Sequence, residues 1–299
     1  MPATAARLCP SSDGTLIYAE ASGNPANPSV VFAHGFALSG IVFDKLFSDT
    51  RLLEKLYLAS TRVRYDVRGH GRSGKPPSAE GYASALYAAD FYAVAKEFSL
   101  NMPVFVGWSA GVGGMVAPII SDICSHISPV PLSGAIAMSG ALCVATAAKT
   151  LKPKLLKLFP KFRSSDAVTA LSTRVEFVDA VFNDPGKVPF AVKAAWIGTT
   201  VLQTPDLTIA IGTGHKPDQT KLVELGAQGF PAMIIYGTQD EFQDGNIVTT
   251  EARPYFTDLE VAAIEGGSHS VFYDNVGETV GHILSFCLRV NSKGAGPKS

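Results

Sequence analysis

Charge is what this sequence has least of. Asp, Glu, Lys and Arg make up 17% of its 299 residues, and the 25 basic residues nearly balance the 26 acidic ones. Globular chains average about 25% charged residues. Lys and Arg form no cluster along the chain, whereas phosphate binding needs several cations on one face. We therefore expect no nucleic-acid partner.

The charge deficit is concentrated in the middle of the chain. Between Phe98 and Ala148, a stretch of 51 residues, Asp122 is the one formally charged side chain. A helix needs about 20 consecutive apolar residues to cross a bilayer, but glycine, serine and proline residues divide this stretch into shorter pieces. We interpret the stretch as protein core and expect no membrane span.

Two further absences concern location and bound metal. The N-terminal residues up to Gly14 contain no apolar run after Arg7 that would mark a secretory signal, so we expect a cytoplasmic protein. The cysteines are scattered, without the C-x-x-C spacing of a zinc site or the pattern of a disulfide scaffold. They are Cys9, Cys124, Cys143 and Cys287, and we expect free thiols and no metal.

Short apolar runs alternate with amphipathic stretches along most of the chain. Most of the runs are continuous, as in parallel strands that are buried on both faces, and their alternation with helices predicts an α/β protein with a parallel sheet. The predicted strands are Leu16–Ala21, Val30–Ala33, Arg62–Val67, Val104–Gly107, Gly134–Met138, Ala232–Tyr236 and Leu259–Ile264. The predicted helices between them are Asp44–Leu58, Ala83–Phe98, Ala110–His126 and Asp274–Val290.

One region departs from this alternation. From about Ala145 to Gly214 the pattern is helical without a clear strand. A helical insertion between two strands of such a sheet commonly forms a lid over a pocket. We predict a core domain of residues 1–144 and 215–299, and a helical cap of residues 145–214.

Residues 107–111 read Gly-Trp-Ser-Ala-Gly and continue from a predicted strand into a predicted helix. In that context the pattern G-x-S-x-G presents its serine on a sharp turn. Gly107 and Gly111 lack the side chains that would keep strand and helix apart. The N–H groups at the start of the helix favour a developing anion, so Ser109 is our candidate nucleophile.

A serine nucleophile needs a base, and the base needs an orienting acid. His269 lies in the loop after the last predicted strand, where it can reach across the carboxyl edge of the sheet. His215, by contrast, lies in a turn that we interpret as exposed linker. Asp240 leaves the preceding strand at the same edge. Glu241 and Asp244 follow closely and compete with Asp240 for the role of acid.

Two backbone N–H groups are candidates for an oxyanion hole, which would stabilise a tetrahedral intermediate. One belongs to Phe36, because the turn that Gly35 permits can direct this group into the space above Ser109. The other belongs to Ala110, directly after the candidate nucleophile. His34, at the start of the same turn, is assigned a structural role.

Residues 64–74 form the other conspicuous segment. Asp66, Arg68 and Arg72 predict a tight loop that is held by charge-assisted hydrogen bonds within it. The segment lacks the G-K-[ST] and G-x-G-x-x-G patterns of phosphate sites. We interpret it as scaffold.

These motifs together resemble the α/β-hydrolase fold superfamily over nearly the whole chain. Residues 34–36 are similar to its oxyanion turn, 66–73 to its D-x-R-G-x-G-x-S loop, and 107–111 to its nucleophile elbow. Residues 237–240 and 267–269 are similar to its acid and base loops, in the chain order serine, acid, histidine. The resemblance implies an eight-stranded, mostly parallel sheet flanked by helices, with a cap inserted after the sixth strand. Trp108 departs from the family pattern, which often has His, Asp or Gly before the nucleophile.

The resemblance also implies acyl transfer without a cofactor, with Ser109, His269 and Asp240 as the catalytic triad. A serine nucleophile disfavours the epoxide-hydrolase and haloalkane-dehalogenase branches, which need a carboxylate. The apolar predicted cap indicates a small, uncharged, partly apolar ester or lactone as substrate. We expect Phe36, Trp108 and Trp196 to contact it.

Other functions stay open at this point. Relatives with the same triad hydrolyse carbon–carbon bonds or act as cofactor-free perhydrolases. A small-molecule receptor would keep the pocket and hardly turn substrate over. The sequence does not indicate an oligomeric state.

Overall fold

The computed structural model describes residues 5–23, 29–54, 61–109 and 117–294. Within these residues eight strands form one sheet in the order β1-β2-β4-β3-β5-β6-β7-β8. The strands are β1 (Ala5–Pro10), β2 (Leu16–Gly23), β3 (Ser29–Ala33), β4 (Thr61–Tyr65), β5 (Val104–Trp108), β6 (Gly134–Met138), β7 (Ala232–Gly237) and β8 (Leu259–Ile264). The pairs β1–β2 and β2–β4 are antiparallel and the other five are parallel. The prediction of a mostly parallel, eight-stranded sheet is confirmed.

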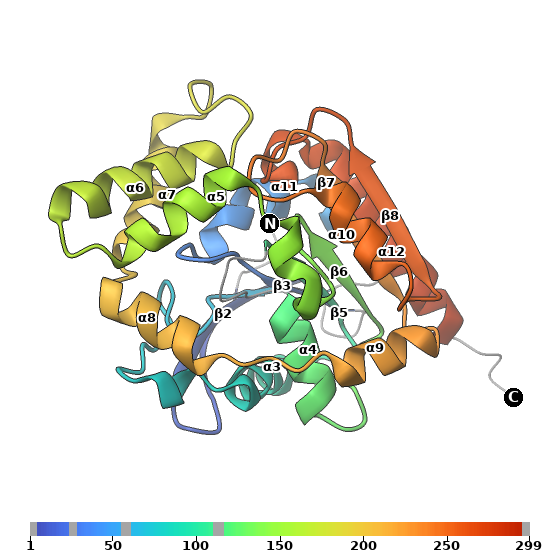
Figure 1. Cartoon of the computed structure of the whole chain (residues 1–299). Coiled ribbons are helices and arrows are strands. Elements are labelled where there is room, and N and C mark those ends of the chain that lie inside the picture. Colours follow the sequence, from blue (N-terminus) through green and yellow to red (C-terminus); the bar gives the residue numbers. More distant parts are fainter. Residues whose placement is uncertain (1–4, 24–28, 55–60, 110–116, 295–299) are drawn as a thin grey trace, which may run out of the picture.

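Helices connect the strands and flank the sheet (Figure 1). The α-helices are α1 (Asp44–Phe47), α2 (Thr50–Glu54), α3 (Ser84–Glu97), α4 (Ala117–His126), α5 (Pro153–Leu158), α6 (Ala167–Ala180), α7 (Phe190–Val201), α8 (Pro205–Gly214), α9 (Thr220–Ala227), α10 (Gly245–Ala252), α11 (Val271–Asp274) and α12 (Val276–Gly294). Four 3-10 helices complete the set: η1 (Gly40–Phe43), η2 (Ala79–Tyr82), η3 (Val144–Thr150) and η4 (Phe159–Arg163).

The predicted strands coincide with β2 to β8, with two differences. The strand β4 ends at Tyr65 rather than at Val67, because the N–H of Val67 donates to Nε2 of His34 (3.0 Å). The edge strand β1 was not predicted, since only Cys9 among its residues is buried and no apolar run marks it. The first seven residues of the predicted helix Ala110–His126 lie outside the described part of the chain.

Residues 145–214, predicted as a cap and named here the α5–α8 segment, run from η3 to α8 and lie between β6 and β7 in the chain. Apart from one isolated bridge between Leu151 and Gln243, the segment contributes helices and connecting turns. Helices α5 to α8 gather on the left of Figure 1, away from α9 and α12. Its separation as a domain of its own stays a prediction.

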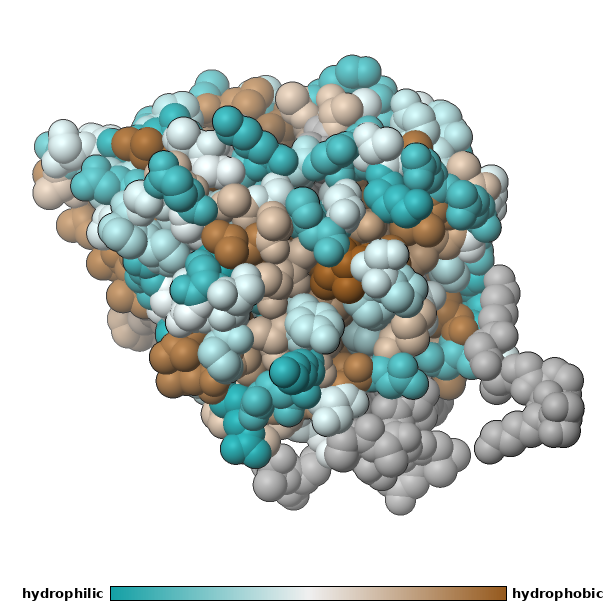
Figure 2. Space-filling view, turned by 90° about the horizontal axis from the view of Figure 1, so that it is seen from below, coloured by the Kyte–Doolittle hydropathy of each residue, from teal (hydrophilic) through white to brown (hydrophobic). Residues whose placement is uncertain are grey.

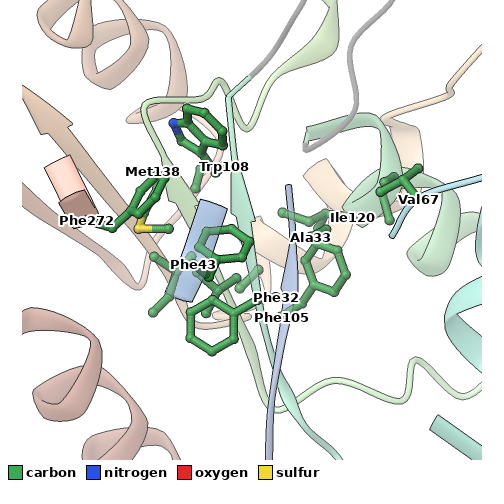
Figure 3. Packing of buried hydrophobic residues seen from close by; sticks show 14 of the residues in the cluster. Phe32, Ala33, Phe43, Val67, Phe105, Trp108, Ile120, Met138 and Phe272 are labelled. Carbon is green, nitrogen blue, oxygen red and sulfur yellow. The ribbon is translucent and has the colours of Figure 1, made fainter. Parts of the chain in front are cut away.

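The hydrophobic core is centred on the parallel strands. Every residue of β3, β5 and β6 is buried, which accounts for the scarcity of charge between Phe98 and Ala148. Figure 3 shows the rings of Phe32 and Phe43 packed together within this core. The ring of Phe105 lies apart from them and packs against Phe91 of α3. In the part of the chain that the structure covers, no helix combines the length and the apolar character needed to cross a membrane.

His215 is not an exposed linker residue, and that interpretation is wrong. Its Nε2 lies 2.6 Å from Oδ2 of Asp122, the single charge of the central stretch, and both side chains are almost completely buried. The imidazole ring also stacks on Tyr87, with ring centroids 4.2 Å apart. The contact connects the residue directly after α8 to α4. A sequence typical of an exposed turn therefore contains a buried histidine that holds two elements together.

Candidate active site

Ser109 occupies a strained turn at the carboxyl end of β5. Its φ angle is 68°, in the left-handed region that residues with side chains rarely adopt. Its N–H donates to the carbonyl of Met138 at the end of β6 (2.8 Å), which fixes the turn to the sheet. A Cβ at Gly35 would lie 3.0 Å from Cβ of Ser109. Glycine at position 35 therefore lets the loop after β3 approach the candidate nucleophile.

The three residues predicted as a triad form one chain of hydrogen bonds. Oγ of Ser109 lies 2.8 Å from Nε2 of His269, and Nδ1 of His269 lies 2.8 Å from Oδ2 of Asp240. A carboxylate can only accept, so Nδ1 carries the proton and Nε2 is free to accept from the serine hydroxyl. All three side chains are buried, with Ser109 the most exposed at 8%. This arrangement matches the serine, base and acid order of a nucleophilic triad.

The competition among three neighbouring carboxylates is resolved by geometry. Oδ1 of Asp240 accepts from the N–H groups of Phe242 (2.8 Å) and Gln243 (3.0 Å), while Oδ2 faces His269. Glu241 points outward and pairs with Lys154 on the surface. Asp244 caps α10 by accepting from its first N–H groups. Asp240 is thus the carboxylate that reaches the histidine.

The α5–α8 segment holds both triad loops from outside. Nζ of Lys152 donates to the carbonyl of Asp240 (2.6 Å), and the N–H of Lys152 donates to the carbonyl of Phe242 (2.8 Å). On the base side, the carbonyl of Val181 accepts from both the N–H (3.0 Å) and the hydroxyl (2.7 Å) of Ser270. These contacts were not predicted, because no local pattern connects residues so far apart in the chain.

Trp108 is tied to the histidine loop. Its indole N–H donates to the carbonyl of His269 (2.8 Å), and only 1% of the residue is exposed. The ring packs edge-on against Phe272 at 4.9 Å and lies 6.1 Å from the ring of Trp196. The structure therefore brings two of the three predicted substrate contacts together beside His269, and one of them, Trp108, is hydrogen-bonded to the His269 backbone.

Replacing Trp108 by phenylalanine removes the indole N–H and keeps an aromatic ring in the core. A buried carbonyl left without its donor costs about 1–3 kcal/mol, and the freed His269 loop should sample other positions. We expect kcat/KM for a p-nitrophenyl ester to fall about tenfold or more. The control is Trp196→Phe, which makes the same change 6.1 Å away. Because Trp196 is itself a predicted substrate contact, its loss should appear in KM. A fall in kcat as large in Trp196→Phe as in Trp108→Phe would contradict a positioning role for the Trp108 hydrogen bond.

Of the two residues predicted to donate to an oxyanion, the structure describes one, Phe36. Phe36 lies in the loop after β3, and its ring packs against Phe159 (5.0 Å) and Phe162 (5.2 Å) of η4. It thus joins the loop after β3 to the α5–α8 segment, and the preceding residue, Gly35, is the one that approaches Ser109. Ala110, the second predicted donor, lies outside the described residues. The oxyanion hole stays a prediction.

The prediction that charged groups hold the loop of residues 66–74 from within is wrong for Arg68. Its guanidinium bonds outside the loop, to the carboxylate of Asp90 on α3 (2.5 and 2.6 Å) and to that of Asp13 (3.0 Å). Arg68 therefore ties the loop to its neighbours.

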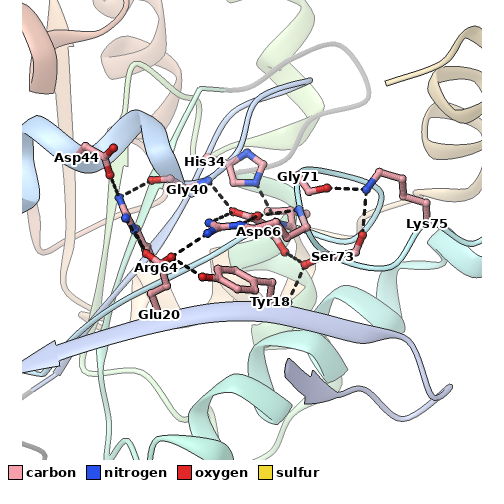
Figure 4. Close-up of polar contacts among 12 residues, drawn as sticks. Tyr18, Glu20, His34, Gly40, Asp44, Arg64, Asp66, Gly71, Ser73 and Lys75 are labelled. Carbon is pink, nitrogen blue, oxygen red and sulfur yellow. Dashed lines mark hydrogen bonds and ion pairs between the residues drawn. The ribbon is translucent and has the colours of Figure 1, made fainter. Parts of the chain in front are cut away.

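Asp66 does hold the loop in place together with Arg72, as predicted (Figure 4). Its carboxylate accepts from the N–H of Gly40 (2.7 Å) and from the N–H and Nε of Arg72 (both 2.9 Å). Burial alone would raise the pKa of Asp66, but the hydrogen bonds and charge of Arg72, with a contribution from His34, lower it below its usual value. Nearby, Ser73 donates to the carbonyl of Asp66.

His70, in the same loop, should make the protein sensitive to acid. Complete burial, followed by the effect of neighbouring His34, lowers the pKa of His70 from 6.5 to about 3. Between these two pH values the unfolded chain binds a proton that the folded chain does not, so stability falls as the pH falls. We expect His70→Asn to reduce this slope by about 1.4 kcal/mol per pH unit.

Chemical denaturation at several pH values between 7 and about 4 measures this slope. His282→Gln is the matched control, because 39% of the His282 side chain is exposed on α12. Unchanged slopes in His70→Asn would contradict the assignment.

The sequence of this chain is similar to a known protein family and to several named bacterial proteins. Residues 30–281 match the sequence profile of the alpha/beta hydrolase family. The chain is 32% identical over 155 residues to the non-heme chloroperoxidase of Streptomyces lividans, a match covering 52% of each protein. It is 42% identical over 108 residues, 36% of its length, to the "Probable oxidoreductase EphD" of Mycobacterium bovis. That match spans only 17% of the mycobacterial protein.

Solved structures agree with the fold. The esterase RhEst1 from Rhodococcus superposes with a TM-score of 0.80, covering 95% of this chain and 99% of the esterase at 23% sequence identity. An identity this low supports the shared fold alone. The chain spans about half or less of the curated relatives named above.

Proposed function

Because the chain belongs to the alpha/beta hydrolase family, we propose that it is a serine hydrolase that cleaves an ester or lactone bond. The observation that carries the proposal is the hydrogen-bonded chain from Ser109 through His269 to Asp240. Strained backbone at the serine and burial of the acid are both expected of a nucleophile and its orienting group.

In the first half of the reaction His269 takes the proton of Ser109 through Nε2, and the serine oxygen attacks the substrate carbonyl. Asp240 keeps Nδ1 protonated and stabilises the imidazolium that forms. The backbone N–H groups of Phe36 and Ala110 would hold the oxyanion. Collapse of the tetrahedral intermediate passes the proton from His269 to the leaving alcohol and leaves an acyl group on Ser109.

In the second half a water molecule replaces the alcohol. His269 accepts a proton from this water, whose oxygen attacks the acyl carbonyl, and then returns the proton to Ser109 as the acid leaves. The protein's own groups supply each of these steps, and the proposal assigns no role to a cofactor.

The proposed substrate is small, uncharged and partly apolar. Support comes from the aromatic surroundings of the base, where Trp108 and Phe242 lie 5.5 and 5.0 Å from the ring of His269. Trp196 and Phe36 extend this apolar surface toward the α5–α8 segment, which we propose as the cap. Apolar walls favour uncharged ligands, since a buried charge without a partner is costly.

An organophosphonate that reacts with activated serines tests the proposal directly. Intact-mass measurement should show one adduct on the protein and none on Ser109→Ala. A panel of p-nitrophenyl esters of increasing chain length and simple lactones then reports turnover. A labelled protein without turnover on any of them would favour the receptor or carbon–carbon hydrolase function, and an unlabelled one would contradict a nucleophilic serine.

A perhydrolase activity is the second candidate, favoured by the likeness to the chloroperoxidase of Streptomyces lividans. In this reaction hydrogen peroxide replaces water in the attack on the acyl group, and the product is a peracid in place of an acid. Oxidation of a halide indicator in the presence of acetate and hydrogen peroxide, abolished by Ser109→Ala, would support it.

A further inference from the structure

The outer face of α7 contains no polar side chain. Its exposed residues are Phe190, Ala191, Ala194, Ala195, Gly198 and Val201. At about 100° per residue these positions fall within about 140° of one another and form one face of the helix. Phe190 is 86% exposed and Val201 48%. A surface helix normally turns charged or polar residues to water. The apolar composition of this face is instead typical of a helix face that another molecule covers.

A neighbouring stripe on α6 extends the apolar surface. Val168, Leu171 and Val175 are 76%, 56% and 42% exposed, and their spacing places them within about 60° on the helix. The two helices pack together, because Arg174 of α6 donates to the carbonyls of Thr200 (3.1 Å) and Gln203. Figure 2 shows hydrophobic residues along the left edge of the molecule, the side on which α6 and α7 lie in Figure 1.

The α5–α8 segment, which contains α6 and α7, has a net positive charge, whereas the rest of the protein has a net negative charge. Residues 145–214 contain nine Lys and Arg against five Asp and Glu, whereas the rest of the chain contains 16 against 21. Among the described residues Lys157, Lys161 and Arg163 form no ion pair, and all three are exposed. They lie on α5 and η4, which pack against α6. Exposed cations without an ion pair in the described part of the chain thus lie on elements that pack against the helix carrying the apolar stripe.

We propose that the outer surface of α6 and α7, together with the cations of α5 and η4, docks on an anionic lipid bilayer. Apolar side chains next to lysines are the features with which interfacial helices bind membranes, and anionic headgroups attract the cations. A second copy of the chain fits less well, because a symmetric interface would bring together two segments of net positive charge.

The docking surface also borders a cavity beside Trp196. Ala191 and Ala195 of the exposed face line a cavity of about 450 Å³. Trp196 also lines it, as do the polar residues Asp44, Lys45 and Ser48. Trp196 in turn lies beside Trp108, which is bonded to the base loop. The apolar face of α7 therefore lies next to a cavity that two contacting tryptophans separate from the His269 loop.

Co-sedimentation with vesicles tests the proposal on the whole protein without using its activity. We expect binding to vesicles of phosphatidylcholine mixed with phosphatidylglycerol, and much weaker binding to phosphatidylcholine alone. Phe190→Ser with Val201→Ser should lower the partition coefficient at least about tenfold. Lys157→Gln with Lys161→Gln should lower it about fivefold for each cation, and salt should have a similar effect.

The matched control is Leu8→Ser with Tyr92→Ser, which removes side chains of similar exposure, 54% and 56%, from β1 and α3. This variant should bind vesicles as the parent does, and circular dichroism should show that all variants are folded. Absence of binding to anionic vesicles, or equal loss in the control variant, would overturn the proposal. So would a dimer on gel filtration that Phe190→Ser with Val201→Ser converts to a monomer, since a second copy would then cover this face.

Discussion

Replacing Ser109 by alanine is expected to lower kcat for p-nitrophenyl ester hydrolysis by about 10⁴- to 10⁶-fold. Without the hydroxyl no acyl group can form on the protein, and water must attack the substrate directly. The remaining rate would come from binding and from whatever oxyanion stabilisation the backbone provides. Because Ser109 has a φ angle of 68°, alanine at this position is strained no more than serine is, so the fold should be kept.

Ser139 provides a close control for this variant. It lies just after β6, has a φ angle of 42° and is 1% exposed, so it shares the backbone strain and burial of Ser109. It lacks the contact to His269 that distinguishes the candidate nucleophile. Ser139→Ala should therefore keep nearly full activity. If the two variants lose activity equally, or if Ser109→Ala keeps more than a few per cent, a nucleophilic serine is contradicted.

The triad could be predicted because each member follows a strand of the same sheet edge. Ser109 follows β5, Asp240 follows β7 by a short loop, and His269 follows β8. Parallel strands bring their carboxyl ends to one edge, so loops far apart in sequence converge there. What the sequence left open was which carboxylate in the loop after β7 faces the base. That choice depends on hydrogen bonds from Phe242 and Gln243, which no residue pattern encodes.

The hydrogen-bond partners of the α5–α8 segment and of His215 directly after it could not be predicted from the sequence. The bonds from Lys152 to Asp240 and from His215 to Asp122 join residues 88 and 93 positions apart. An amphipathic pattern indicates that a lysine lies on a helical surface, but its partner depends on how the segment folds back over the sheet. The prediction that His215 is an exposed linker residue is wrong for the same reason, since a glycine-rich turn with a lysine and a proline is typical of solvent-exposed linkers.

Replacing Asp240 by asparagine is expected to lower kcat by about 10⁴-fold while keeping the loop in place. In the parent protein the N–H groups of Phe242 and Gln243 donate to Oδ1 of Asp240, and the amide oxygen of asparagine can still accept both hydrogen bonds. The amide nitrogen then faces Nδ1 of His269 as a donor, so the imidazole must accept there and carry its proton on Nε2. In that tautomer Nε2 can no longer take the proton of Ser109. The loss should thus appear in kcat, with KM changed little.

Glu241→Gln and Asp244→Asn separate this chemical effect from disturbance of the loop. Glu241 is exposed and pairs with Lys154 at the surface, where an ion pair contributes at most about 1 kcal/mol. Asp244 caps α10, and asparagine is an equally good cap. Both variants should keep kcat within a few fold of the parent protein. A large loss in either one, with a small loss in Asp240→Asn, would move the orienting role to the neighbouring carboxylate and would require the loop after β7 to turn differently during catalysis.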